Sequence, residues 1–257
     1  MQPQTKREYL RDLVAEKNRW QRQLTDEEKS LGFLGWHERG YLPHCDFPGL
    51  VQFVTFRLAD SMPVSRRGEW EHLLKLEDDR EKRTKLEEYL DRGIGQCHLR
   101  DSRIAQMAEA ALLFEHKQSY ELLAWCVMPN HVHVLVHVWN KPLWKLIGLW
   151  KKYVSAKSLA LLRAERRSSD RPVSESDTAG PDQSSALQQF WQREYWDTFM
   201  RDEEQEKAAV RYIENNPLKA ILCSAQASWP FSSARFRDKY SRLMIPSGTP
   251  VFRPASS

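Results

Sequence analysis

The clearest pattern in the sequence is an alternation of histidine and valine over His131–Val138, which reads HVHVLVHV and is interrupted at Leu135. A period of two is typical of a β-strand with one buried face. An apolar run, Tyr120–Met128 (YELLAWCVM), precedes it, and Pro129 and Asn130 lie between the two. Because this dipeptide favours a turn, the region is predicted to form two strands joined by a tight connection.

One more core strand and a short extended segment are predicted elsewhere. Leu50–Leu58 (LVQFVTFRL) is rich in β-branched and aromatic residues, and Phe190–Phe199 (FWQREYWDTF) is an aromatic extended segment. The other periodic or strongly charged segments are predicted to be helices: Arg7–Lys29, Ser65–Tyr89, Asp101–His116, Pro142–Arg163 and Asp202–Asn216. The last helix is expected to end at Asn216 because Pro217 follows.

The order strand, helices, strand, strand, helix, short strand, helix predicts an α+β domain. We expect a ferredoxin-like antiparallel sheet with helices on one face, plus an N-terminal helical extension. Residues 1–40 are assigned to this extension, 41–240 to a single domain and 241–257 to a C-terminal tail. Within the domain, residues 166–186 are rich in Ser, Asp, Pro and Gly, so a disordered insertion is expected there.

Composition narrows the class of protein only slightly. The 257 residues carry a net charge of +4, which permits nucleic-acid binding but does not establish it. No apolar run is long enough to span a bilayer, and the first residues lack the apolar core of a signal peptide. The 4 cysteines lie far apart without a CxxC pair, so reduced thiols and a cytoplasmic location are expected.

The alternating strand carries two histidines that share a face. Residues two apart in a strand point the same way, so His131 and His133 project together while the intervening valines project to the other face. Two neighbouring imidazoles are a natural pair of ligands for one divalent metal ion. We expect them on the exposed face of the strand. A His-x-His pair also occurs by chance, without any metal.

The helix predicted over Asp202–Asn216 carries a second candidate pair. Tyr212 and Asn216 are four residues apart, so they lie on one face of the helix. Tyr212 would offer a nucleophile, and Asn216 a third metal ligand. The small side chains of Ala208 and Ala209, one turn earlier, would allow close packing. The alternative is that Tyr212 is an ordinary core aromatic.

Five segments, in this order, resemble the REP-associated tyrosine transposases, a family of single-tyrosine HUH nucleases. They are Val54–Leu58 (VTFRL), Met128–Leu135 (MPNHVHVL), Phe190–Asp197 (FWQREYWD), Tyr212–Ala220 (YIENNPLKA) and Trp229–Ala234 (WPFSSA). The resemblance covers roughly residues 40 to 237. The Ser-rich insertion departs from the compact pattern of the family, but it falls between the motifs.

The resemblance implies an HUH nuclease fold and a metal-dependent endonuclease and strand transferase for single-stranded DNA. It makes His131 and His133 the metal ligands, Tyr212 the nucleophile and Asn216 the third ligand, at a position that is often glutamine in the wider family. Mg²⁺ or Mn²⁺ is the expected cofactor, because an amide oxygen suits a hard cation. Attack by Tyr212 would leave a 5′-phosphotyrosine and a free 3′-hydroxyl.

No general base can be identified from the sequence. Tyr153 and Tyr195 are rival nucleophiles, but neither has a ligand-capable partner one turn away within the matching motif.

The resemblance also implies a bacterial, nucleoid-associated protein whose partner is single-stranded or hairpin DNA formed by palindromic repeats. We expect no membrane partner, and a monomer or a homodimer. The residues that could contact phosphates or stack on bases are Lys145, Lys151, Lys152, Lys157, Arg163, Trp144 and Trp150. A solvated helix face would have the same composition.

Two other functions remain open. The chain could bind nucleic-acid hairpins without catalysing a reaction. It could also be an unrelated metallohydrolase that uses the two histidines with water as nucleophile, in which case Tyr212 would be dispensable.

Overall fold

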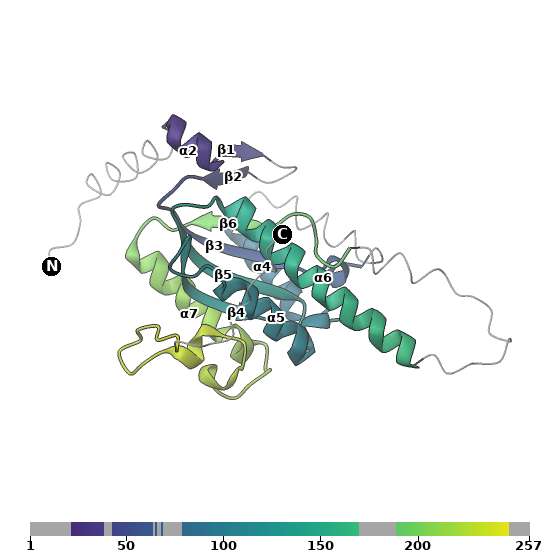
Figure 1. Cartoon of the computed structure of the whole chain (residues 1–257). Coiled ribbons are helices and arrows are strands. Elements are labelled where there is room, and N and C mark those ends of the chain that lie inside the picture. The colour runs from purple at the N-terminus through teal and green to yellow at the C-terminus, as the bar shows by residue number, and fades with distance from the viewer. Residues whose placement is uncertain are drawn as a thin grey trace.

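The computed structural model describes residues 22–38, 43–63, 65, 68, 79–169 and 189–246. Its core is a 4-stranded sheet of β3 (Val51–Arg57), β4 (Tyr120–Val127), β5 (His131–Val138) and β6 (Trp196–Phe199) (Figure 1). The strands lie in the order β4-β5-β3-β6, and all neighbours are antiparallel. With helices between β3 and β4 and between β5 and β6, this order is ferredoxin-like. The α+β prediction is confirmed.

The histidine strand β5 lies inside the sheet, between β4 and β3. His131 pairs with Arg57 of β3, and Val132 pairs with Val127 of β4. Because hydrogen-bonded neighbours hold β5 on both sides, the direction of its side chains is fixed by the sheet rather than by local preference.

Helices cover both faces of the sheet. α5 (Ser102–Leu113) and α6 (Leu143–Ser169) contact each other and belong to the large hydrophobic core that includes the valines of β5. α7 (Glu203–Lys219) packs against β4 and β5 in a second, smaller core on the opposite face. The expectation of helices on one face therefore holds for α5 and α6, and α7 has to be added on the face toward which the histidines project.

Two predicted helices end later than expected. α6 continues to Ser169, so residues 166–169 are helical and the prediction of disorder is wrong there; residues 170–186 lie outside the described part. α7 continues through Pro217 to Lys219, because a proline this close to the helix end removes only one donor while Ala220 N–H still donates to Asn216 O.

α4 (Asp79–Asp91) is the described part of the helix expected over Ser65–Tyr89, of which residues 66, 67 and 69–78 lie outside the description. It ends before Gly93, whose φ of 64° is easily reached without a side chain. Short 3-10 helices lie at Ala59–Ser61, His98–Arg100, Gln226–Ser228 and Ser233–Phe236.

The N-terminal extension is only partly helical where it is described. Thr25 caps α2 (Asp26–Leu31), so the helix expected over Arg7–Lys29 does not run unbroken to its end; its residues 7–21 lie outside the description. β1 (Gly35–Glu38) then pairs with β2 (Pro43–Asp46), across the expected domain boundary at residue 40.

The segment after residue 240 packs against the domain as far as it is described. Leu243 and Ile245 contact the large core, and Met244 N–H donates to Phe236 O at 2.8 Å. Residues 247–257 lie outside the description. No helix of the described ranges is long and apolar enough to cross a membrane.

Candidate active site

The two histidines of β5 face each other through their Nε2 atoms. These atoms of His131 and His133 lie 2.9 Å apart. The side chains are 1% and 0% exposed, so the expectation of an exposed position is wrong. The reason is that α7 packs across this face of β5, which the sequence pattern does not reveal.

The second nitrogen of each ring has its own partner. Asn130 Oδ1 lies 2.8 Å from His131 Nδ1, and Thr55 Oγ1 lies 2.8 Å from His133 Nδ1. The amide of Asn130 cannot turn over, because its Nδ2 donates to the carbonyls of Leu90 and Ile94. Its oxygen must therefore accept a proton carried by Nδ1 of His131.

His131 is held in the neutral form. Burial, with the nearby positive charge of Arg57, lowers its pKa to about 3. A neutral imidazole has one ring proton, and here it lies on Nδ1. Nε2 of His131 therefore directs a lone pair at His133, which is the arrangement that metal-ligating histidines adopt.

α7 brings Tyr212 and Asn216 to the same place. Asn216 Nδ2 lies 3.4 Å from His133 Nε2 and donates to the Tyr212 hydroxyl at 3.2 Å. The ring of Phe53 stacks on His133 and meets Tyr212 edge-on, with centroids 5.5 and 5.8 Å apart. The residues predicted from the sequence thus lie in one cluster, and among them only Tyr212 is partly exposed.

The donor set fits a divalent cation, the cofactor that the resemblance implies. Asn216 Oδ1 is buried and has no hydrogen-bond partner within the described part of the chain. Rotation of the amide by half a turn would exchange this oxygen with Nδ2, so that the oxygen would face His133 and could serve as a metal ligand. Nowhere in the described ranges do three His, Cys, Asp or Glu side chains converge as a metal site. A metal here therefore depends on the Asn216 oxygen as the third ligand beside the two histidines.

Two acidic residues of α4, which the sequence pattern does not single out, complete the surroundings of Tyr212. Glu87 is buried and forms a hydrogen bond with the Tyr212 hydroxyl, and the Asp91 carboxylate lies 3.5 Å from Lys219 Nζ. Burial, followed by the charges of Glu87 and Asp91, raises the pKa of Tyr212. Their spacing of four residues was the available signal, but it does not reveal which element they face.

The rival tyrosines lie elsewhere. Tyr195 is buried in the large core, where its ring lies tilted against that of His44 with the centroids 4.7 Å apart, and Tyr153 packs against the same core. Tyr153 belongs to α6, across the sheet from the histidine pair, and Tyr195 directly precedes the edge strand β6.

The predicted DNA contacts of α6 divide into three groups. Trp150 is 4% exposed in the core, so it cannot stack on bases. Lys145, Lys151 and Trp144 donate to backbone carbonyls of Leu31, Gln192 and Gly32, which ties α6 to its neighbours. The exposed side chains are Lys152, Lys157 and Arg163.

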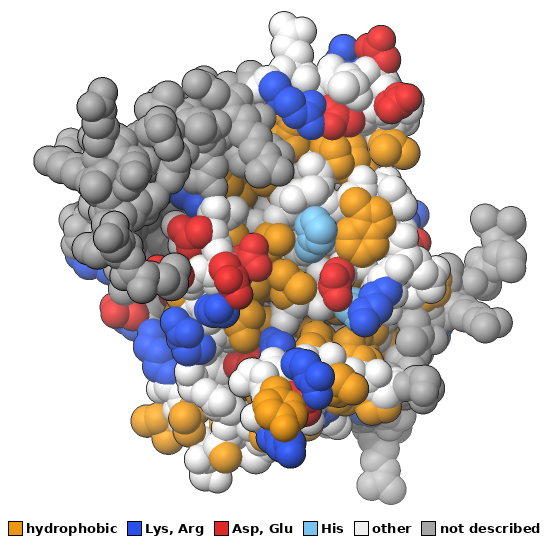
Figure 2. All heavy atoms as spheres, turned by 90° about the vertical axis from the view of Figure 1, so that its left-hand side faces the viewer, with side chains coloured by type: hydrophobic (Ala, Val, Ile, Leu, Met, Phe, Trp, Pro, Cys, Tyr) orange, Lys and Arg blue, Asp and Glu red, His pale blue; other side chains and the backbone are white. Residues whose placement is uncertain are grey.

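A groove of about 440 Å³ runs along the start of α6. Its charged lining residues are all basic: Lys141, Lys145, Lys151, Lys152 and Arg193. A larger cleft, of about 810 Å³, lies beside α7 and has acidic and basic residues in its lining. Figure 2 shows the face seen from the left of Figure 1, where acidic, basic and hydrophobic side chains are interspersed. Of the two hollows, only the groove on α6 has the single sign of charge that suits phosphates.

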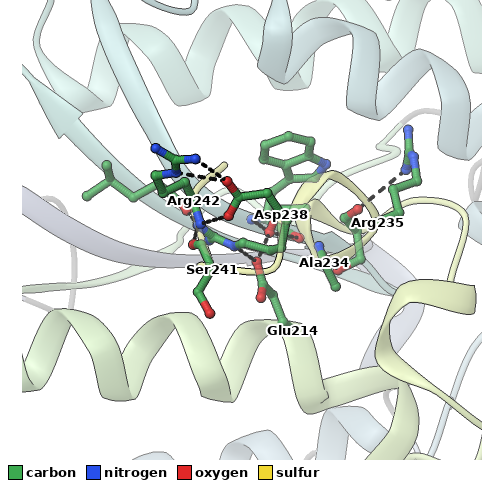
Figure 3. A network of polar contacts seen from close by, with 11 residues as sticks. Glu214, Ala234, Arg235, Asp238, Ser241 and Arg242 are labelled. Carbon is green, nitrogen blue, oxygen red and sulfur yellow. Dashed lines mark hydrogen bonds and ion pairs between the residues drawn. The ribbon is translucent and has the colours of Figure 1, made fainter. Parts of the chain in front are cut away.

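α7 itself is held in place by a network of polar contacts that begins at Glu214 (Figure 3). Glu214 accepts hydrogen bonds from Ser233 Oγ at 2.6 Å and from Arg237 Nε at 2.8 Å. Arg237 also donates to Leu123 O of β4 at 2.6 Å. Because Glu214 lies between Tyr212 and Asn216 in the helix, this network fixes the height of both side chains above the sheet.

Comparisons with known proteins agree with the motifs. No family model matches the chain. A REP-associated tyrosine transposase of Haemophilus influenzae is 25% identical over 114 residues, which is 44% of this chain and 58% of that protein. A solved structure of a REP-associated tyrosine transposase bound to a REP hairpin matches with a TM-score of 0.43 and 15% identity, over 86% of this chain and 98% of that one. The resemblance to this family is confirmed, and the curated relative is matched over little more than half of its length.

Proposed function

We propose that this chain is a transposase-like nuclease that cuts and rejoins single-stranded DNA beside hairpins, through a covalent bond to Tyr212. The observation that carries the proposal is the convergence of Tyr212, Asn216 and the histidine pair, which come from elements far apart in the sequence. The resemblance to the transposase of H. influenzae supports the substrate class.

In this proposal, three residues bind the metal ion and a fourth attacks the DNA. Nε2 of His131 and His133 and Oδ1 of Asn216 would hold Mg²⁺ or Mn²⁺. Such an ion, when bound, stabilises the negative charge that develops on the scissile phosphate. Tyr212 Oη attacks the phosphorus and the bond to the 3′-oxygen breaks. The phosphotyrosine preserves the ester, so a 3′-hydroxyl can attack it and rejoin a strand.

The basic groove of α6 is the proposed path of the DNA backbone outside the reaction centre. The exposed Lys152 lies in this groove, and its ammonium can neutralise a phosphate without disturbing the fold. Lys157 and Arg163 follow on exposed positions of the same helix.

The test is to incubate the protein with labelled hairpin oligonucleotides that have single-stranded flanks, and with fully paired duplex, in Mg²⁺. We expect a covalent adduct and a cut in the single-stranded flank, no cut in duplex, and loss of both products in EDTA. Cutting without an adduct would favour the metallohydrolase. Tight hairpin binding with no cut and no adduct would favour a binding protein without catalysis.

A further inference from the structure

Glu87 is the acidic side chain that contacts the hydroxyl of Tyr212. It lies on the buried side of α4, is 9% exposed, and hydrogen-bonds with that hydroxyl. Asn216 Nδ2 donates to the same oxygen at 3.2 Å. Glu87 is a carboxylate, so it can accept the phenol proton of Tyr212 whichever way the Asn216 amide is turned.

The proposed function requires a group that removes the proton of Tyr212, and Glu87 lies where it can do so. A phenol is a weak nucleophile until its proton is removed, and the three expected metal ligands cannot take it, because the histidine nitrogens would be bound to the metal and an amide is not a base. We propose that Glu87 is the general base that accepts the Tyr212 proton while the tyrosine attacks DNA. This inference rests on the proposed function and adds a catalytic residue to it.

The step balances without another reactant. The Oη–P bond forms and the P–O3′ bond breaks; the phenol proton moves to the Glu87 carboxylate, and the leaving 3′-oxygen takes a proton from water. When a 3′-hydroxyl later attacks the phosphotyrosine, it releases its own proton to the solvent, and the protonated Glu87 returns its proton to Tyr212. The net reaction in each direction is a transesterification.

Asp91 is the rival base, one turn further along α4. Its carboxylate faces Lys219 Nζ at 3.5 Å and the Asn216 amide. Asp91 therefore lies beside a candidate metal ligand, whereas Glu87 contacts the reacting oxygen itself. A purely structural role for Glu87, as a buried hydrogen-bond acceptor that holds α4 on α7, is the second alternative.

The experiment compares rates of adduct formation in single-turnover assays with the hairpin substrate and Mg²⁺. The variants are Glu87→Gln, Glu87→Asp, Asp91→Asn and, as a matched control on the exposed side of α4, Glu88→Gln. We expect Glu87→Gln to be slower by roughly 100-fold or more and Glu88→Gln to be unchanged. Glutamine still accepts a hydrogen bond, so a structural role predicts that it outperforms the shorter aspartate. A general base predicts the reverse, because only aspartate can take the proton.

A second measurement isolates the proton transfer. A fluorinated tyrosine, whose phenol is more acidic, is introduced at position 212 of the wild-type chain and of each variant. We expect the fluorinated tyrosine to restore the rate of adduct formation in Glu87→Gln alone, with hairpin affinity and thermal stability unchanged.

Equal rates for Glu87→Gln and wild type would overturn the inference and leave the proposed function intact. Glutamine outperforming aspartate, or rescue of Asp91→Asn in place of Glu87→Gln, would overturn it as well. If the wild-type protein forms no adduct at all, the proposed function fails first.

Discussion

At the scale of single residues, the proposed metal-dependent chemistry depends on which nitrogen of each imidazole carries the proton. Thr55 lies directly opposite His133 in the β3–β5 ladder, and its hydroxyl holds His133 Nδ1 at 2.8 Å. The sequence places both residues in strands, but it does not give the register that makes them partners. A residue that hydrogen-bonds to a metal ligand orients that ligand. Its loss commonly lowers the affinity for the metal about 10- to 100-fold.

Thr55→Val is therefore expected to weaken Mn²⁺ binding by about 10-fold while the fold is retained. Valine has nearly the shape of threonine, so it fills the same space beside His133 but cannot form the hydrogen bond with Nδ1. Titration calorimetry with Mn²⁺ measures the effect, and circular dichroism checks the fold. Unchanged Mn²⁺ affinity in a folded variant would show that the hydroxyl does not orient a ligand.

At the scale of elements, the proposed reaction centre requires α7 to lie at a fixed position on the histidine face. The helix is anchored through the buried Glu214, which accepts hydrogen bonds from Arg237 and Ser233. The helix, its acidic first turn and the four-residue spacing of Tyr212 and Asn216 are predictable from the sequence. The anchor is not, because it joins α7 to β4 through a segment that has little regular structure.

Arg237→Ala is expected to destabilise the protein by about 3 kcal/mol, because it leaves the Glu214 carboxylate buried without its cation. Arg242→Ala is the matched control from the same network. Its side chain is 68% exposed and pairs with Asp238 four residues earlier, so the expected loss is below about 1 kcal/mol. Urea unfolding gives both values, and equal losses would contradict the anchoring role of Arg237.

At the scale of the whole molecule, the sequence predicts which face of a strand or helix is buried better than it predicts which elements cover that face. Alternation in β5 identifies the face of the histidines, because only that register buries the valines. It does not reveal that α7 and the acidic residues of α4 enclose this face. Likewise, Trp150 has the composition of a base-stacking residue, but its place on the inner side of α6 puts it in the core.

The burial of His131 also makes the stability of the protein depend on pH. Its pKa falls from 6.5 to about 3 on folding, because burial and then Arg57 disfavour the charged ring. The unfolded chain takes up a proton near the ordinary pKa, whereas the folded chain does not. The stability contributed by the neutral ring is therefore complete above that pKa and is lost as the pH falls toward the folded value.

His131→Gln should remove this dependence. Between pH 6.5 and 4.5, wild type is expected to lose roughly 2 kcal/mol more than the variant in metal-free buffer. Urea unfolding at a series of pH values with EDTA measures the difference. Parallel curves for the two proteins would show that His131 is not held neutral by the fold.

The most direct test of the central claim is to identify the residue that becomes joined to DNA. Adduct formed with a hairpin substrate and Mg²⁺ is digested with nuclease and trypsin, and the peptides are sequenced by mass spectrometry. Cleavage after Arg211 and Lys219 releases YIENNPLK, which contains Tyr212 and no other tyrosine. We expect a nucleotide phosphate on this peptide and no adduct in Tyr212→Phe, while Tyr153→Phe and Tyr195→Phe still form it. A nucleotide on any other peptide, or an adduct that persists in Tyr212→Phe, would contradict the assignment of Tyr212 as the nucleophile.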